Sequence, residues 1–142
     1  KYNNIYKPCI IFFLMPLKML LVDESITMSL QKIQIEKDLG YQVDCAEKIE
    51  QARQLLNDND YQALMIEPFV NKDTLGPNTP RIEFIREARE RNIPVIISSA
   101  QLPTFLFESF KLVYGRDYQF FLEKPYFFDD IKVGLKKIVE GE

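Results

Sequence analysis

The sequence predicts a single α/β domain in which five parallel strands form one sheet with helices on both faces. Two observations support this prediction. Short apolar runs alternate five times with longer stretches whose apolar residues recur at helical spacing. The chain has 142 residues, 46% of them hydrophobic, which is the size and composition of one globular domain. Strands separated by helices join through right-handed crossovers, and such crossovers make the sheet mostly parallel.

The predicted strands are short and mostly apolar. Uninterrupted apolar residues favour strands that are buried on both faces, whereas the alternating second run is typical of a strand nearer an edge. In chain order, we expect strands at Lys18–Val22, Tyr41–Ala46, Ala63–Ile66, Val95–Ile97 and Phe120–Leu122. Five strands of this class favour the flavodoxin-like order 2-1-3-4-5.

Helices are expected between these strands, from apolar residues spaced three and four positions apart. In the first helix, Asp23–Leu39, we expect Ile26, Leu30 and Ile33 to form the apolar face, and Gly40 to end the helix. The other helices are expected around Ile49–Leu56, Ile82–Ala88, Phe105–Tyr114 and Ile131–Ile138. Residues 1–17 are interpreted as an N-terminal extension of unknown role, and residues 18–142 as the domain itself.

Composition excludes several classes of site and partner. The absence of histidine removes Ser-His and Cys-His catalytic pairs and histidine metal sites, and Cys9 and Cys45 form no Cys-x-x-Cys motif. A net charge of −3 without a basic segment argues against nucleic acid and against anionic membrane surfaces. The longest apolar run, Cys9–Met15, is shorter than the ~20 residues that a membrane span needs. We therefore expect a cytoplasmic protein with no nucleic-acid or membrane partner.

Polar side chains follow several predicted strands. Asp23 and Glu24 follow the first strand, Glu67 the third, Ser99 the fourth and Lys124 the fifth. Because ligands bind at the carboxyl ends of parallel strands, we expect these side chains to meet at one edge of the sheet. Three nearby carboxylates favour protonation of one of them or a bound divalent cation, and oxygen ligands suit Mg²⁺. A lysine and a hydroxyl could contact a phosphoryl oxygen, whereas Asp23 taken alone could simply cap a helix.

Four segments resemble the conserved blocks of response-regulator receiver domains, also called CheY-like domains. They are Leu20–Glu24, Tyr61–Glu67, Ile96–Ala100 and Phe121–Pro125, and the resemblance covers roughly residues 17–142. It implies a role in two-component signal transduction or a phosphorelay, as a binding module rather than an enzyme. A histidine kinase or a downstream effector protein would be the partner.

The resemblance also implies roles for individual residues. Asp23 and Glu24 match the acidic pair that helps to hold Mg²⁺, Ser99 the switch hydroxyl, Lys124 the conserved lysine and Phe121 the aromatic switch residue. Packing under the fourth helix is an equal alternative for Phe121. In receivers, the face formed by the fourth helix, fifth strand and fifth helix mediates homodimers or effector contacts. In the predicted fourth helix, Phe105 and Phe107 point off the apolar stripe, and we interpret them as residues of that interface.

Glu67 departs from the family pattern, because receivers carry at this position the aspartate that accepts the phosphoryl group. Glutamate reaches about 1.5 Å further, which spoils in-line attack and places an oxygen where Mg²⁺ or the phosphoryl group should lie. Asp23, Glu24 and Glu67 would be the Mg²⁺ ligands, and the departure counts against that site too. We expect an atypical receiver, or pseudo-receiver, in which Glu67 mimics phosphorylation or the site is inert.

Two alternatives stay open. One is a working phosphorelay receiver, with Glu67 or another acid at the same edge accepting the phosphoryl group. The other is a small α/β nucleotide-binding protein or enzyme on the same fold. Against the second, the chain has only five glycines, and none of them forms a phosphate-binding spacing.

Overall fold

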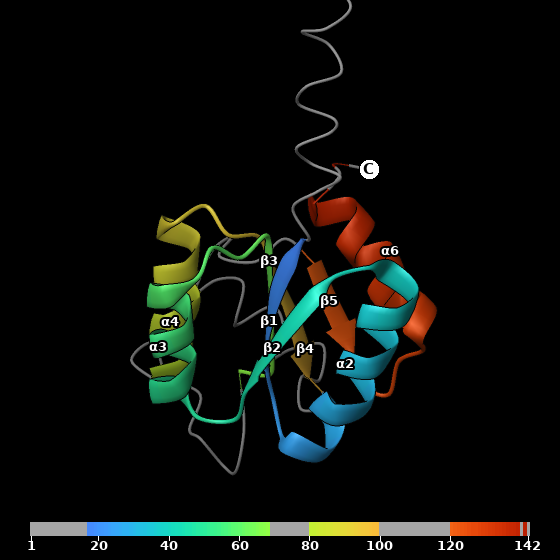
Figure 1. Cartoon of the computed structure of the whole chain (residues 1–142), viewed down its shortest axis with the longest axis horizontal. Coiled ribbons are helices and arrows are strands. Elements are labelled where there is room, and N and C mark those ends of the chain that lie inside the picture. The colour runs from blue at the N-terminus through green and yellow to red at the C-terminus, as the bar shows by residue number, and fades with distance from the viewer. Residues whose placement is uncertain (1–16, 69–79, 100–119, 140, 142) are drawn as a thin grey trace, which may run out of the picture.

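A parallel five-stranded sheet forms the centre of the molecule, as the computed structural model shows (Figure 1). The structure describes residues 17–68, 80–99, 120–139 and 141. The strands are β1 (Lys18–Val22), β2 (Gln42–Ala46), β3 (Ala63–Ile66), β4 (Val95–Ser99) and β5 (Phe120–Glu123). Their order is β2-β1-β3-β4-β5, and every neighbouring pair is parallel. The predicted fold class and strand order are therefore confirmed.

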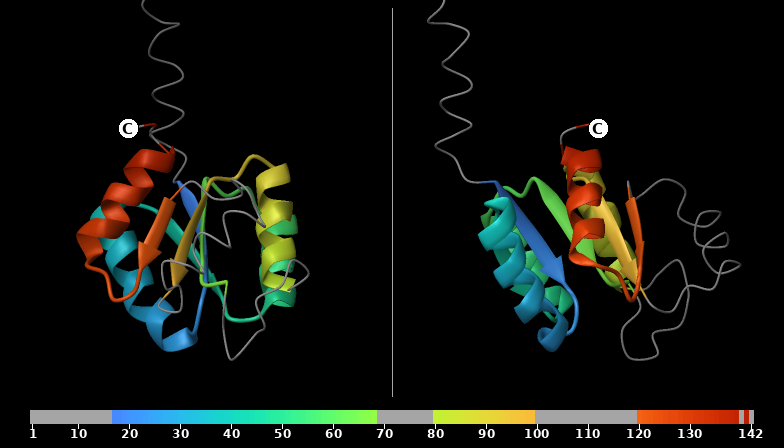
Figure 2. Two further views of the ribbon diagram at one scale, coloured as in Figure 1. Left: turned by 180° about the vertical axis from the view of Figure 1, so that it is seen from behind. Right: turned by 90° about the vertical axis from the view of Figure 1, so that its right-hand side faces the viewer.

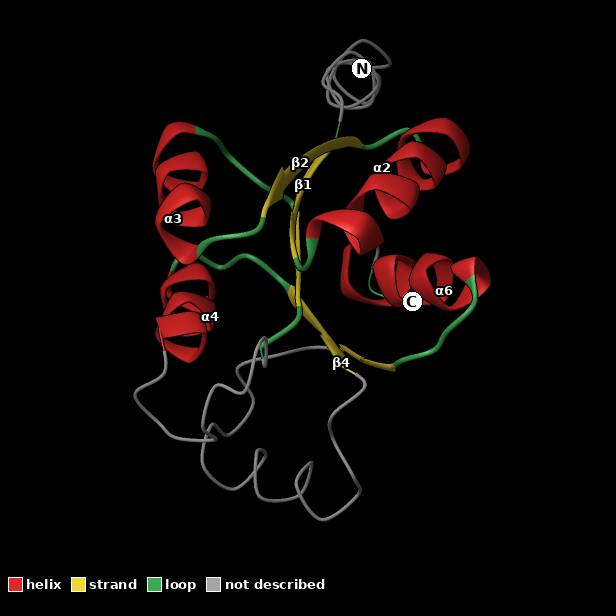
Figure 3. Cartoon of the chain, turned by 90° about the horizontal axis from the view of Figure 1, so that it is seen from below, coloured by secondary structure: helices red, strands yellow, loops and turns green. Residues whose placement is uncertain are grey.

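Two pairs of helices cover the two faces of the sheet. The described helices are α2 (Ser25–Leu39), α3 (Ile49–Asp58), α4 (Pro80–Glu90) and α6 (Phe128–Val139). Figures 2 and 3 show α2 and α6 on one face and α3 and α4 on the other. All four agree with the predicted helices to within three residues at each end. The helix predicted at residues 105–114, with Phe105 and Phe107, lies outside the described residues, as do residues 1–16 of the predicted extension.

The core consists of two layers, one on each side of the sheet. Successive residues of a strand point to opposite faces, so β1, β3 and β4, which are almost entirely buried, contribute to both layers. One layer packs against α3 and α4 and includes the fully buried Phe84. The other packs against α2 and α6 and includes Met19 and Ile35. No helix among the described residues is long and apolar enough to cross a membrane.

The first described helix, α2, ends at a glycine that is suited to stop it. Gly40 adopts a left-handed conformation, with φ at 74°, directly after α2. A side chain at this position would be strained, because L-residues avoid this region, so Gly40 is well suited to end the helix. The chain then turns into β2, and the predicted helix stop is confirmed.

The predicted apolar face of α2 was wrong. Ile26, Leu30 and Ile33 are 84%, 70% and 62% exposed, while Met28 and Ile35 on the opposite side of the helix are buried. The physical reason is that α2 carries apolar residues on two faces, so helical spacing alone fits either orientation. The face that packs also places Gln31, 8% exposed, where its side-chain amide donates a hydrogen bond to the Tyr126 hydroxyl.

This orientation of α2 predicts unequal costs for two truncations on the same helix. We expect Ile35→Ala to lower the free energy of unfolding by about 2–4 kcal/mol, because it opens a cavity in the core. Leu30→Ala removes an exposed side chain and should cost less than about 0.5 kcal/mol. Urea unfolding at low protein concentration measures both, and equal losses for the two variants would contradict the orientation.

Candidate functional site

Three charged side chains meet at the carboxyl edge of the sheet. Asp23 follows β1, Glu67 follows β3 and Lys124 follows β5. The Lys124 Nζ lies 2.7 Å from Asp23 Oδ2 and 3.3 Å from Glu67 Oε2. Asp23 and Lys124 are 101 residues apart in the chain, and they meet because parallel strands end at a common edge. We call Asp23, Glu67 and Lys124 the ion cluster.

The ion cluster is largely shielded from water. The side chains of Asp23 and Glu67 are each 6% exposed, and that of Lys124 is 21% exposed. Buried carboxylates are costly unless they are paired and hydrogen-bonded, and one ammonium group here contacts both of them. Burial by itself lowers the pKa of Lys124, but the hydrogen bond and charge of Asp23, with the charge of Glu67, outweigh it and raise that pKa above its ordinary value.

Backbone hydrogen bonds at the strand ends fix the positions of these side chains. The Glu67 amide donates to the Val22 carbonyl at 2.9 Å, and the Lys124 amide donates to the Ser99 carbonyl at 2.9 Å. The second carboxylate oxygen of Asp23 accepts a hydrogen bond of 2.7 Å from the Glu24 amide at the start of α2. The Asp23 carboxylate therefore joins the start of α2 to the ion cluster.

A buried arginine of α4 binds the backbone of Glu67, from the face of the sheet opposite to α2 and α6. Arg81, 6% exposed in the first turn of α4, donates to the Glu67 carbonyl at 2.7 Å and to the Glu47 carbonyl at 2.8 Å. The guanidinium thus links the end of β3 to the segment after β2. Sequence reasoning missed Arg81, because its partners are backbone carbonyls and such partners leave no motif in the sequence.

The other predicted site residues lie at the same edge but contribute differently. Glu24 is exposed and occupies the N-cap of α2, without a side-chain capping bond. Ser99 is fully buried at the end of β4. Phe121 is half-buried and packs against the core layer of α3 and α4, whereas the predicted fourth helix, under which the packing alternative places it, lies outside the described residues. The structure therefore brings Asp23, Glu67 and Lys124 into contact and leaves the Glu24 side chain in solvent.

A second polar group lies on the α2 side of the ion cluster. The Tyr126 hydroxyl accepts hydrogen bonds from the Gln31 amide and from the Ser98 hydroxyl, the latter at 3.3 Å. Burial raises the pKa of Tyr126, although the bonds from Ser98 and Gln31 and the charge of Lys124 act against that rise. Tyr126 follows Lys124 after a cis Lys124–Pro125 peptide bond. These contacts connect α2 to the segment that carries the lysine.

The described side chains do not fit a Mg²⁺ site as they are arranged. Among the described residues, no group of three or more acidic or cysteine side chains is placed to hold a metal ion. Mg²⁺ prefers an octahedral set of oxygen ligands, whereas here an ammonium group contacts both buried carboxylates and Glu24 points into solvent. Mg²⁺ binding by Asp23, Glu24 and Glu67 therefore stays a prediction from the sequence.

No protein-family model and no curated protein matches the sequence. Solved structures are similar to the chain in fold. The chemotaxis protein CheY4 of Vibrio cholerae aligns with a TM-score of 0.68 at 19% identity, over 87% of this chain and 99% of that chain. The signal receiver domain of an HD domain-containing protein from Pseudomonas fluorescens Pf-5 aligns with a TM-score of 0.71 at 17% identity, over 89% and 97%.

A third neighbour is the response regulator TrrA of Thermotoga maritima, whose structure was solved in complex with Mg²⁺ and BeF. It aligns with a TM-score of 0.66 at 19% identity, over 87% of this chain and 99% of that one. This chain has the fold of a response-regulator receiver domain. The identities are 19% or lower, so the likeness to these three structures establishes the fold alone.

The ion cluster predicts a stability loss with a defined pH dependence. Lys124→Met removes the ammonium group that contacts the buried Asp23 and Glu67, and should lower the free energy of unfolding by about 2–4 kcal/mol at neutral pH. A lysine with a raised folded pKa adds stability that is complete below its ordinary pKa of about 10.4 and is lost as the pH rises through the folded value. The difference from wild type should therefore shrink in alkaline solution, as the lysine loses its proton.

Urea unfolding of both proteins across a pH series measures this difference. Lys132→Met, which removes an exposed lysine of α6, is the matched control and should cost less than about 0.5 kcal/mol. A Lys124→Met variant as stable as the control at neutral pH would show that the ion cluster contributes nothing to folding.

Proposed function

We propose that this chain is an atypical receiver of two-component signalling that binds protein partners without being phosphorylated. The observation that supports it most is the contact between the buried Glu67 carboxylate and the Lys124 ammonium. In the receiver fold, the end of β3 is where the phosphoryl-accepting carboxylate is expected. Here that position carries Glu67, a longer acid. Its carboxylate oxygen contacts Lys124, which matches the conserved lysine of receivers.

The geometry argues against Glu67 as a phosphoryl acceptor. An acceptor oxygen has to attack phosphorus in line, while the lysine contacts the transferred group. The side chain of Glu67 is 6% exposed, and its Oε2 lies 3.3 Å from Lys124 Nζ. An incoming phosphoryl group would have to displace this contact and reach an oxygen that water barely reaches. The contact therefore favours a Glu67 that stays paired with Lys124 over one that accepts a phosphoryl group.

The same contact supports phosphomimicry. A phosphorylated receiver would place a negative charge beside the lysine, and Glu67 places one there permanently. Lys124 is held from a second side by Asp23 at 2.7 Å, and its backbone amide is bonded to the buried Ser99 at the end of β4. We infer that the carboxyl edge is held in one state, without Mg²⁺ and without a phosphodonor.

A module fixed in this way would recognise its partner at all times. The partner we propose is an effector protein of a two-component pathway in the cytoplasm, and a histidine kinase would be a binding partner rather than a phosphodonor. The chain would act as a binding protein and not as an enzyme. Control would then come from the amount of protein or of its partner.

Exposure to a small phosphodonor tests the proposal directly. The wild-type chain, incubated with acetyl phosphate and Mg²⁺, should show no gain of a phosphoryl group by intact-mass measurement, because its acceptor position is buried and paired. A receiver with aspartate at the acceptor position, treated in parallel, is the positive control. A stoichiometric gain that maps to Glu67, or to any other acid at this edge, would overturn the proposal and establish a working phosphorelay receiver.

Removing the charge of Glu67 tests the mimicry. Glu67→Gln preserves the size of the side chain and should weaken binding of effector proteins captured from the source cells about 10-fold or more, since it removes the fixed anion. Glu50→Gln, an exposed change on α3, is the matched control and should bind as wild type does. If Glu67→Gln retains the same proteins equally well, Glu67 is inert and the mimicry is wrong.

A further inference from the structure

One layer of the molecule carries all the large apolar side chains that are exposed among the described residues. They are Ile26, Leu30 and Ile33 on α2, Val133 on α6 and Phe127 directly before α6, and each is between 57% and 84% exposed. Figure 3 shows α2 and α6 side by side on one face of the sheet. Scattered apolar side chains need no explanation, but a group confined to one layer indicates an interaction surface. We call this layer the α2–α6 face.

The α2 part of this face is a continuous uncharged stripe. At 100° per residue, Ile26, Leu30 and Ile33 fall within an arc of about 60° and span about 10 Å along the helix. The exposed residues beside them in the same turns, Ser29 and Gln34, carry no charge. Leu30 lies at the middle of the stripe, four residues after Ile26 and three before Ile33. Depletion of charge around exposed apolar residues is typical of the centre of a protein interface.

The α6 part carries a symmetric arrangement of charges around an apolar residue. Val133 is flanked by Asp129 and Asp130, four and three residues before it, and by Lys136 and Lys137, three and four residues after it. All five side chains are exposed. Read in either direction from Val133, the positions are the same and the charges are opposite. Such an arrangement is complementary to itself when two copies of the helix run antiparallel.

Two face-to-face arrangements of identical copies have two-fold symmetry. If the axis lies along the helices, they run parallel and α6 faces the α2 stripe of the second copy, which leaves its charges without partners of opposite sign. If α6 lies on that axis, its acids face acids and its lysines face lysines. If the helices run antiparallel, Val133 meets Val133, the acids meet the lysines, and Leu30 on α2 meets Leu30. Like charges placed opposite each other are strongly disfavoured, so the charges select the antiparallel arrangement.

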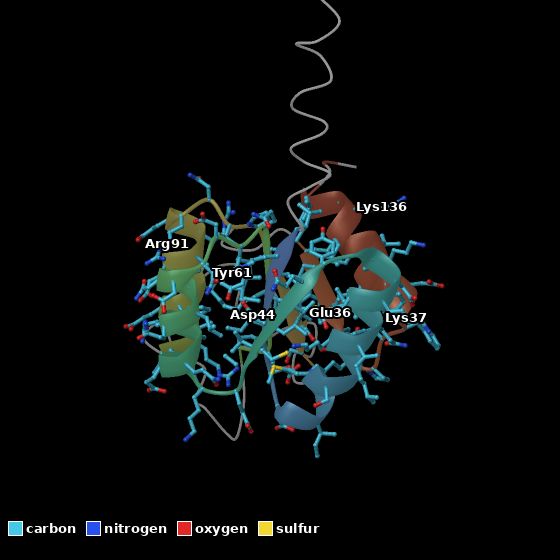
Figure 4. The ribbon with its side chains drawn as sticks, in the orientation of Figure 1. Glu36, Lys37, Asp44, Tyr61, Arg91 and Lys136 are labelled. Atoms are coloured by element: carbon cyan, nitrogen blue, oxygen red, sulfur yellow. The ribbon has the colours of Figure 1, made fainter. Side chains whose placement is uncertain are left out.

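We propose that the α2–α6 face is the dimerisation surface of this chain, with a second copy bound antiparallel across a two-fold axis near Leu30 and Val133. A second copy fits this face best for two reasons. The charges around Val133 on α6 are complementary to themselves, and the apolar stripe on the neighbouring α2 can pack against its own copy. Figure 4 labels Lys37 in the last turn of α2 and Lys136, one of two lysines in the last turn of α6. Asp38, next to Lys37, is an acidic residue at this otherwise basic end of α2.

The dimer is independent of the proposed function, since no contact in it requires the charge of Glu67. It also differs from the homodimer that the receiver resemblance implies. That homodimer would combine α6 with β5 and the predicted fourth helix, whereas this one combines α6 with α2. The apolar area of the stripe is modest, and exposed ion pairs add specificity more than affinity. A dissociation constant in the range of about 1–100 µM is expected for a surface of this size.

Sedimentation of the 142-residue chain over a concentration series tests the proposal. Wild type should pass from monomer to dimer between about 1 and 500 µM. Leu30→Glu places two carboxylates at the centre of the interface and should weaken the dimer at least about 30-fold. Gln51→Glu adds the same charge to an exposed position of α3 and should dimerise as wild type does. Thermal unfolding of both variants verifies that they are folded.

Charge exchange on α6 tests the antiparallel arrangement. Asp129→Lys and Lys136→Glu should each weaken the dimer about 5- to 10-fold, and the double variant should regain wild-type affinity. The two single variants, when mixed, should form a mixed dimer more tightly than either forms its own. A monomer at all concentrations, a dimer unaffected by Leu30→Glu, or a double variant weaker than both single variants would overturn the proposal.

Discussion

One ammonium group between two buried carboxylates is the interaction on which the carboxyl edge of the sheet depends. Lys124 Nζ lies 2.7 Å from Asp23 and 3.3 Å from Glu67, and these residues come from three different strand ends. The ammonium group offsets negative charge of two carboxylates that are buried together. It also fixes the ends of β1, β3 and β5 relative to one another. The site is therefore an element of the fold as well as a candidate for recognition.

The same interaction connects the carboxyl edge to α2. Asp23 accepts a hydrogen bond from the amide of Glu24 at the start of this helix, and Gln31, two turns later, bonds to Tyr126 beside the lysine segment. The exposed stripe begins at Ile26, three residues after Asp23. The two proposed binding functions, at the carboxyl edge and at the dimer surface, thus both involve α2.

The sequence was a good guide to the fold and a partial guide to the site. Uninterrupted apolar runs located β1 and β3 with the correct bounds, because strands of a parallel sheet are buried on both faces. The expected meeting of Asp23, Glu67 and Lys124 followed from topology alone. The orientation of α2 could not be predicted in this way. The helix has apolar residues on two faces, and only its packing against the sheet determines which face is buried. Arg81 could not be anticipated either, because it binds backbone carbonyls.

A crystal structure of the chain grown in Mg²⁺ and a phosphoryl analogue such as beryllofluoride tests the central claim most directly. The account predicts that Lys124 Nζ stays within hydrogen-bonding distance of both Asp23 and Glu67, with neither the metal nor the analogue bound at this edge. Glu67 turned into solvent, or an ordered metal and beryllofluoride beside Asp23 with Lys124 contacting the analogue, would contradict it.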